Sequence, residues 1–262
     1  MTIGLSSSII MIAVVLAPTV EGPDDAPEAY HSTAYGYHLE VPPGWVEIPK
    51  DAMEMMSAFL LNQDVEQKII HDAGFQLASA GHWLEYPYVL VQPVMYADYG
   101  LHRQINEDEF PRHVQLMTGL DVDELTEDAL SSHARQLLVD LDAERPELDV
   151  VRRRYLWHLN MDAKGFGPVR GLIAGHFGRD SVVQVAFYSL RSDWDRYAEV
   201  RSAIIDSFRF DPEKAYSIAV AQANPTPPPR WHSVLRGALI GAIVGALWGV
   251  IGMMKRKRKV RT

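Results

Sequence analysis

The sequence predicts an α+β fold, in which helices pack on an antiparallel sheet, and it adds one C-terminal transmembrane helix. Three observations support this prediction. Strand-like segments follow one another through tight turns, without a regular β-α-β alternation. Amphipathic helical segments stand between these strands and after them. Residues 237–254 carry no charge and form an apolar run of 18 residues, which as a helix would extend about 27 Å.

The first half of the chain predicts four strands and one helix. Residues 35–41 alternate apolar and polar side chains, as a half-buried strand does, and Pro42-Pro43-Gly44 ends that strand in a turn. On the helix, Met53, Met56 and Leu60 share one face. The expected elements are strands at 35–41, 45–48, 74–79 and 88–96 and a helix at 50–61.

The second half predicts three helices and three strands. Asn106 and Glu109 have the spacing of a capping box, and Thr126 is expected to cap a further helix. The run Gly178-Arg179-Asp180-Ser181 predicts a hairpin turn, and Ser192 and Asp195 again have capping spacing. The expected elements are helices at 110–117, 127–138 and 194–208 and strands at 150–160, 169–177 and 182–190.

Composition and charge narrow the function classes. The chain has 262 residues, of which 47% are hydrophobic and 23% charged, and no cysteine. These values exclude a disordered tail, a disulfide scaffold and thiol chemistry. The net charge of −9 has two parts, because residues 1–254 hold 19 basic and 34 acidic side chains whereas 255–261 hold six basic ones and no acid. An acidic body repels phosphate, so we expect no nucleic-acid partner.

The C-terminal segment predicts a membrane anchor. Residues 231–254 have the length and hydropathy of a transmembrane helix. Basic side chains stay on the cytoplasmic side, so we expect the C-terminus inside the cell membrane and the rest of the chain outside. A buried helix of a globular core is the alternative. The expected topology determinants are Lys255, Arg256, Lys257, Arg258, Lys259 and Arg261.

A glycine ridge runs along this segment. Gly237, Gly241, Gly245 and Gly249 recur every four residues and therefore lie on one face of a helix. Such a ridge lets a second backbone approach closely, which predicts a homodimer or a partner transmembrane helix. Glycine is also common in membrane helices that have no such partner, so the ridge alone does not decide between these interpretations.

The N-terminus predicts export. Residues 9–17 form an apolar stretch of the length found in signal peptides, although no Lys or Arg precedes it. A Pro-rich run after the domain predicts an extended stalk. The expected organisation is a signal peptide at 1–22, a spacer at 23–33, an α+β ectodomain at 34–210, a stalk at 211–230, a transmembrane helix at 231–254 and a basic cytoplasmic tail at 255–262.

No motif predicts a catalytic, cofactor or metal site. The chain lacks HExxH, GxSxG and the GxxxxGK[ST] phosphate loop. Among its ten histidines, His158 and His176 fall on neighbouring predicted strands, and two ligands do not complete a metal site. We therefore expect no cofactor and no metal. Carboxylates that meet only in space leave an exported hydrolase using carboxylate or histidine chemistry as an alternative.

Three consecutive arginines begin a predicted strand in this acidic domain. Alternation places Arg152 and Arg154 on one face of that strand and Arg153 on the other. A patch for an anionic group is one interpretation. Ion pairs with acids of the same domain are the favoured one, because the domain holds many more acids than bases.

The two ends of the domain resemble a known family. Residues 36–45, GYHLEVPPGW, resemble the strand, proline and Gly-Trp start of PsbP-like domains, and residues 168–210, which close on SFRF, are similar to that family's ending. The family includes lumenal photosystem II extrinsic subunits and exported bacterial lipoproteins. The resemblance implies a helix–sheet–helix sandwich. It carries over no catalytic residue, because Gly44, Trp45 and Phe208 have turn and packing roles.

These observations favour a non-catalytic role. The leading hypothesis is an exported, membrane-anchored binding or assembly module of a bacterial-type envelope, with the lipid bilayer as one partner. The family resemblance implies the same kind of role, since its members are mostly binding or assembly factors. The alternatives are the exported hydrolase and a membrane-structural role through the glycine ridge.

Overall fold

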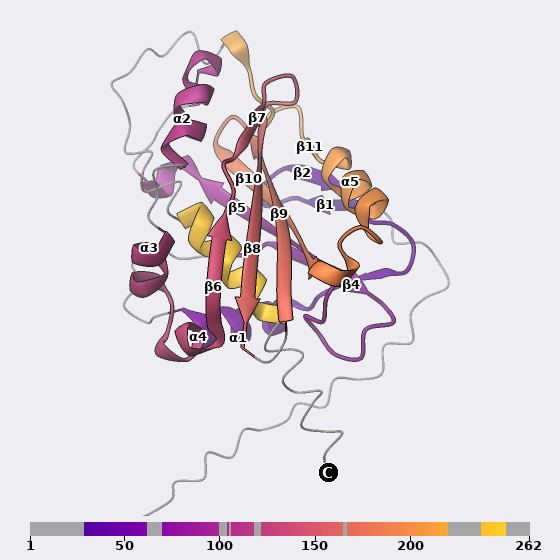
Figure 1. Cartoon of the computed structure of the whole chain (residues 1–262). Coiled ribbons are helices and arrows are strands. Elements are labelled where there is room, and N and C mark those ends of the chain that lie inside the picture. Colours follow the sequence, from indigo (N-terminus) through magenta and orange to yellow (C-terminus); the bar gives the residue numbers. More distant parts are fainter. Residues whose placement is uncertain are drawn as a thin grey trace, which may run out of the picture.

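The fold is built on an antiparallel sheet of eight strands. A computed structural model describes residues 29–61, 70–99, 104, 106–117, 122–164, 167–219 and 237–249. The strand order is β3-β4-β5-β10-β9-β8-β6, and β7 pairs with β8 beside this path (Figure 1). The strands are β3 (Trp45–Glu47), β4 (Ala73–Leu77), β5 (Tyr88–Met95), β6 (Leu138–Ala143), β7 (Glu147–Asp149), β8 (Arg154–Ala163), β9 (Gly167–Phe177) and β10 (Ser181–Leu190).

A second, smaller sheet joins the two ends of the domain. It has the order β1-β2-β11, with β1 (Tyr30–Ser32), β2 (Tyr37–Leu39) and β11 (Arg209–Phe210). Both of its strand pairs are antiparallel. β1 lies in the stretch that the sequence predicts to be a spacer, and its three residues are too few to show an alternating pattern.

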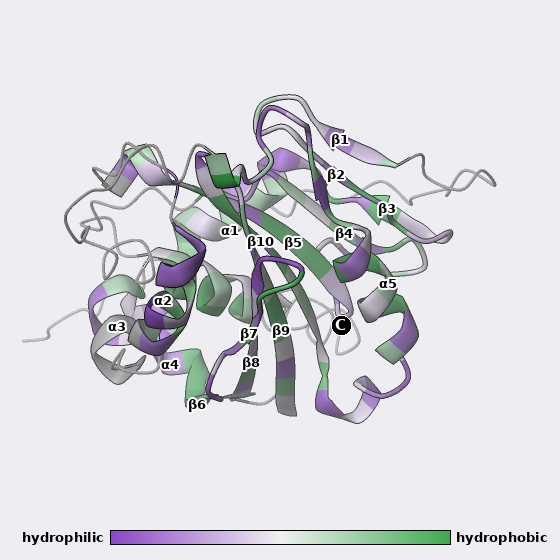
Figure 2. Cartoon of the chain, turned by 90° about the horizontal axis from the view of Figure 1, so that it is seen from above, coloured by the Kyte–Doolittle hydropathy of each residue, from purple (hydrophilic) through white to green (hydrophobic). Residues whose placement is uncertain are grey.

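Helices cover both faces of the large sheet. Figure 2 shows α1 to α4 on one side and α5 with the small sheet on the other. Along β5, Tyr88 and Leu90 enter the core under α1 to α4, while Val89 and Val91 enter the core under α5, because successive strand residues point to opposite faces. The helices are α1 (Lys50–Leu60), α2 (Phe110–Met117), α3 (Val122–Ala129), α4 (Ser132–Leu137) and α5 (Ala198–Ser207), with 3-10 turns η1 (Tyr96–Tyr99), η2 (Glu107–Glu109) and η3 (Arg191–Asp193).

A further helix, residues 237–249, lies inside the core on the α1 to α4 face (yellow in Figure 1). Its side chains from Ala238 to Trp248 are buried. The sequence predicts a transmembrane helix at 231–254, whereas in this structure residues 237–249 of that segment lie in the protein core. None of the described helices has the length and apolar character that crossing a bilayer requires. A helix that is apolar all round fits a protein core as well as a membrane, so its sequence pattern does not separate the two.

Most of the predicted elements are confirmed, with small shifts at their ends. The predicted helix at 50–61 is α1, and the predicted hairpin turn closes through a hydrogen bond from the Gly178 N–H to the Ser181 carbonyl at 2.8 Å. The capping spacing of Asn106 and Glu109 is also used, because the Glu109 carboxylate accepts from the Asn106 N–H at 3.2 Å. The predicted strands at 88–96, 169–177 and 182–190 are β5, β9 and β10.

The helix predicted at 127–138 is wrong. Thr126 lies inside α3, and Ser131 is the N-cap of the next helix, where its hydroxyl accepts from the Ala134 N–H at 3.2 Å. The chain breaks between these helices because Leu130 pairs with Leu61 and the Ser131 N–H donates to the Leu60 carbonyl at 2.8 Å.

Three other predicted boundaries also differ from the structure. Strand β6 begins at Leu138, where a helix end was expected, and β8 begins at Arg154 after a turn in which Arg153 has φ +50°. The helix expected from 194 starts at Ala198, because η3 precedes it.

The ends of the chain are described only in part. Residues 211–219 pack on the domain, where Tyr216 contacts the core and the Gln104 side chain exchanges hydrogen bonds with the backbone of Ser217 at 2.7 and 2.9 Å. The predicted signal peptide, the rest of the predicted stalk, and the basic tail from Lys255 to Arg261 lie outside the described residues.

Candidate functional site

The candidate site is the face of the large sheet that holds the 237–249 helix. We call it the helix-binding face and define it by Tyr86, Tyr88, Leu90, Gln92, Tyr188 and His71. Alternation along β5 brings Tyr88, Leu90 and Gln92 to the same side. Tyr188 joins them because it is the register partner of Tyr88 on β10. A row of side chains spaced at strand periodicity therefore faces a helix.

The glycine ridge of the helix lies against this face. A Cβ atom on Gly245 would come within 2.9 Å of both the Leu90 Cδ1 and the Tyr188 Oη, so no side chain larger than hydrogen fits there without movement. A Cβ on Gly241 would clash with the Gln92 amide, and one on Gly249 with the Tyr86 ring. The ridge thus allows a close approach to a sheet of the same chain. Its predicted pairing with a second helix stays a prediction.

Tyrosine hydroxyls bind the backbone of the helix. The Tyr88 hydroxyl donates to the Gly245 carbonyl at 2.5 Å and accepts from the Gly249 N–H at 2.8 Å. The Tyr188 hydroxyl donates to the Ala242 carbonyl at 2.8 Å. The Tyr86 hydroxyl donates to the Ala246 carbonyl. At the other end of the ridge, the Gln92 Nε2 donates to the Gly237 carbonyl at 3.4 Å. Contacts of this kind recognise a helix with small residues rather than particular side chains.

Burial keeps the ionisable groups of the face neutral. It raises the pKa of Tyr86, Tyr88 and Tyr188 well above the ordinary value, so their hydroxyls act as neutral donors. Burial lowers the pKa of His71 to about 4, because a charged imidazole would be desolvated under the helix. The His71 ring meets the Trp248 ring edge-on, with centroids 4.5 Å apart. At neutral pH the helix therefore covers an uncharged surface.

His158 and His176, which the sequence places on neighbouring strands, do not approach each other closely enough to share a metal ion. The register partner of His176 is Arg154, and that of His158 is Leu172 four residues further along β8. His176 stacks on Phe208 at 4.1 Å, whereas His158 meets Trp194 at 6.1 Å. Each ring is thus part of a separate aromatic contact under α5.

The three arginines pair with acids of the same domain, as favoured from the sequence. Arg154 is buried, and its guanidinium lies 2.7 Å from Asp206 and 3.2 Å from Asp149. Arg153 pairs with Glu107 at 2.5 Å, and Arg152 pairs with Asp149 at 3.4 Å. These ion pairs tie the start of β8 to β7, η2 and α5.

An acidic hollow of about 350 Å³ lies at the β6 edge of the sheet. Its carboxylates come from β6, β8 and the loop after β6, and the Arg170 guanidinium reaches Glu144 at 3.4 Å. Its lining contains carboxylates but no histidine. Nothing tests whether these carboxylates act on a substrate, so the exported hydrolase stays a hypothesis. The lining residues are Asp140, Asp142, Glu144, Asn160, Asp162, Arg170 and Arg191.

Sequence reasoning missed the residues that form the helix-binding face. Their tyrosines lie more than 50 positions from the helix that they bind, so no local pattern connects them. It also missed one group of three metal-ligand side chains, His31, His38 and Asp211, whose donor atoms lie within 4.8 Å of one another in the described part of the chain. The available signal was the pair of histidines on either side of Gly36, which is typical of a hairpin turn.

Comparison with known proteins gives matches in structure only. The sequence matches no protein-family profile and no curated protein. The solution structure of cyanobacterial PsbP (CyanoP) from Synechocystis sp. PCC 6803 is 13% identical and covers 70% of this chain and 91% of its own, with a TM-score of 0.36. The crystal structure of LpqN, involved in cell envelope biogenesis of Mycobacterium tuberculosis, is 12% identical in sequence. The match covers 71% of this chain and 90% of the LpqN chain, with a TM-score of 0.38.

Both similarities are distant. The PsbP-like resemblance predicted from the two ends of the domain is confirmed at this level. Neither structure assigns a ligand, a partner or a location to this chain.

Proposed function

We propose that this protein is a non-catalytic binding module of a bacterial-type cell envelope, exported and anchored through its C-terminal segment. The helix-binding face receives an apolar, glycine-ridged helix. In the closed state that helix is the chain's own residues 237–249. In an open state the same segment leaves the face to enter the bilayer, where its ridge is free to pair with a second copy or with a partner helix.

One observation carries this proposal: three tyrosine hydroxyls hydrogen-bond to the helix backbone at Ala242, Gly245 and Ala246. Phe and Leu would fill a permanently dry core without the cost of desolvating hydroxyl groups. Tyrosine suits a surface that is alternately covered and wet, because its ring packs on the helix and its hydroxyl binds water when the helix leaves.

The helix itself suits two environments. Its buried side chains from Ala238 to Trp248 are apolar apart from the Trp248 indole N–H. A segment of this kind is costly to expose to water, so it occupies either the protein face or a lipid phase. Two features of the sequence support the rest of the proposal. The apolar stretch at 9–17 supports export, and the basic run after Met254 supports a cytoplasmic C-terminus.

A reversible lock tests the proposal in the full chain, because the sequence has no cysteine of its own. A Cβ on Gly241 would fall on the Gln92 side chain, so in the Gln92→Cys/Gly241→Cys variant the two cysteines face each other and oxidation would fix the helix to the sheet. The locked and reduced forms are floated with vesicles of phosphatidylethanolamine and phosphatidylglycerol. We expect the reduced protein to float with the vesicles and the oxidised protein to stay in solution.

The matched control is Gln92→Cys/Val151→Cys, which leaves Gly241 unchanged and so adds no Cβ between the helix and the sheet. Val151 is 91% exposed, so a cysteine there points to solvent and oxidation should leave vesicle binding unchanged. If the locked protein floats as well as the reduced one, the helix is not the anchor. If neither form floats, the helix stays in the core under all conditions and the open state is refuted.

A further inference from the structure

Three metal-ligand side chains meet on one face of the small sheet. β1 and β2 place His31 directly opposite His38, since these two are register partners. β11 pairs with the other edge of β2, with Arg209 opposite His38, and Asp211 follows at the end of that strand. The fold therefore joins two residues near its start to one that lies 180 positions from His31.

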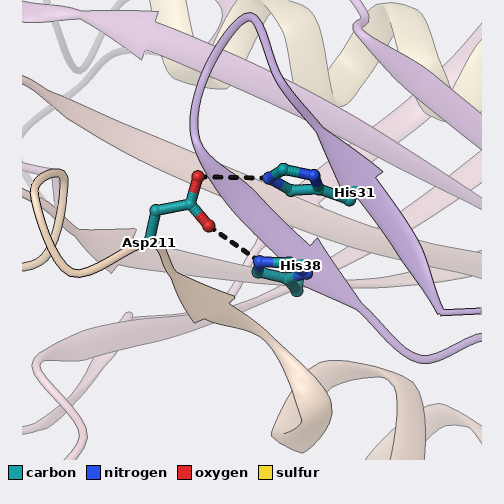
Figure 3. Close-up of side chains that lie close together, drawn as sticks. All are labelled: His31, His38 and Asp211. Carbon is teal, nitrogen blue, oxygen red and sulfur yellow. Dashed lines mark hydrogen bonds and ion pairs between the residues drawn. The ribbon is translucent and has the colours of Figure 1, made fainter.

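All three side chains converge on one point (Figure 3). The His31 Nε2 lies 3.1 Å from Asp211 Oδ2, and the His38 Nε2 lies 2.7 Å from Asp211 Oδ1. The two imidazole rings are parallel within 5°, with centroids 4.1 Å apart, and both Nε2 atoms face the Asp211 carboxylate. The side chains of His31, His38 and Asp211 are 39%, 41% and 15% exposed, which leaves an open side toward solvent.

The backbone holds Asp211 in place. Its N–H donates to the Gly36 carbonyl at 2.9 Å, and its carbonyl accepts from the N–H groups of Lys214 and Ala215 at 2.9 and 2.8 Å. Gly36 has φ +63°, and a Cβ there would lie 3.2 Å from Asp211 Oδ2. Glycine thus lets the β1–β2 turn approach the carboxylate. The nearby ammonium of Lys214 is paired with Asp180 at 2.9 Å.

The donor set fits a particular class of cation. Two imidazole nitrogens and one carboxylate oxygen favour Zn²⁺ or a similar divalent transition metal, whereas Ca²⁺ and Mg²⁺ prefer oxygen ligands alone. Zn²⁺ bonds of about 2.0–2.1 Å place neighbouring ligand atoms of a tetrahedron roughly 3.3 Å apart. The donor atoms of the three side chains lie within 4.8 Å of one another, and the separations of 3.1 and 2.7 Å involve the two different oxygens of the Asp211 carboxylate. Side-chain rotations would bring the two nitrogens and a carboxylate oxygen around one ion.

We infer that His31, His38 and Asp211 form a Zn²⁺ site in which water completes the coordination on the exposed side. This site is independent of the helix-binding face and departs from the expectation of no metal drawn from the sequence. The ion would clamp the β1–β2 hairpin to the end of β11. Each imidazole coordinates through Nε2 in its neutral form, with the proton on Nδ1.

Calorimetric titration of the full chain with Zn²⁺ at pH 7.5 tests this inference, using a protein without a histidine tag. We expect one Zn²⁺ per chain and no binding of Mg²⁺. His31→Gln and Asp211→Asn should each weaken Zn²⁺ binding by at least about 100-fold, because each removes a ligand. The matched control is His133→Gln, which removes an exposed histidine of α4 and should leave the affinity unchanged.

A second measurement uses the unaltered protein and therefore does not require any variant to fold. In the unaltered protein, one equivalent of Zn²⁺ should shift the imidazole ¹⁵N resonances of His31 and His38 and those of no other described histidine. The melting temperature should rise by about 5 °C when Zn²⁺ exceeds its Kd about 100-fold. The inference is overturned if Zn²⁺ does not bind at one ion per chain, or if binding survives in both ligand variants.

Discussion

The backbone N–H of Gly249 donates a hydrogen bond to the side-chain hydroxyl of Tyr88 at 2.8 Å. The same hydroxyl donates to the Gly245 carbonyl at 2.5 Å. Gly245 and Gly249 are four residues apart, so these are the acceptor and donor that a regular α-helix pairs with each other. One strand side chain therefore binds both polar groups of a helical turn. Glycine lets the helix lie close enough to the sheet for this, because a Cβ on Gly245 would meet Leu90 and Tyr188, and one on Gly249 would meet Tyr86.

Removal of this hydroxyl should destabilise the protein without changing its fold. Tyr88→Phe keeps the ring and deletes both hydrogen bonds, so we expect a loss of about 1–2 kcal/mol in the free energy of unfolding. Urea denaturation measures it. Tyr197→Phe, at a half-buried position beside α5, is the control and should change stability by less than about 0.5 kcal/mol. Equal effects of the two substitutions would show that the Tyr88 hydroxyl does not hold the helix.

The close approach at Gly245 makes alanine unfavourable there. In an open helix, Gly→Ala stabilises by about 1 kcal/mol through backbone propensity. At Gly245 the added methyl group would lie 2.9 Å from Leu90 Cδ1 and Tyr188 Oη, so we expect a net loss of about 1–3 kcal/mol.

Gly81→Ala is the matched substitution for this measurement. A Cβ on Gly81 meets only the Glu85 carboxylate at 3.6 Å, so thermal unfolding should detect little change. A stabilising Gly245→Ala would mean that the ridge does not touch the sheet.

Burial of His71 predicts a pH dependence of stability. The pKa of His71 is about 4 under the helix, compared with 6.5 when the imidazole is in water. The unfolded chain therefore takes up the proton first as the pH falls. The contribution of the neutral His71 to the free energy of unfolding is fully present above pH 6.5. It decreases between pH 6.5 and 4, by about 3 kcal/mol at most.

Urea titrations at several pH values check this slope. His71→Gln should reduce the loss of stability between pH 6.5 and 4, whereas His133→Gln should keep the wild-type profile. His176, whose pKa burial lowers to about 3, contributes to the slope in all of these proteins, so the difference between variants is the quantity to compare. Parallel profiles for wild type and His71→Gln would contradict the burial of His71 under the helix.

Local patterns predicted the central strands and α1 because burial on a sheet or helix face leaves a period in the sequence. A strand that is buried on both faces leaves a nearly continuous apolar run instead, as β5 does. β6 was missed because it is an edge strand with exposed residues, including Val139, and lies directly after a helix. No residue of β6 is fully buried, so the strand leaves no continuous apolar run in the sequence.

The functional surfaces depend on contacts between distant positions. The 237–249 helix has the same pattern as a membrane span, and the difference lies in Tyr88 and Tyr188, on strands that the sequence does not connect to it. The group of His31, His38 and Asp211 likewise requires the order β1-β2-β11, which a three-residue and a two-residue strand do not reveal. Residue types were visible in the sequence, but their convergence was not.

Disulfide formation in the Gln92→Cys/Gly241→Cys variant measures most directly whether the helix docks on the sheet of its own chain. The oxidised full chain is compared with the reduced chain by non-reducing gel electrophoresis. We expect rapid cross-linking in a product of monomer size, because a Cβ on Gly241 lies against the Gln92 side chain. No cross-link, or one found only in a dimer, would contradict docking of the 237–249 helix within its own domain.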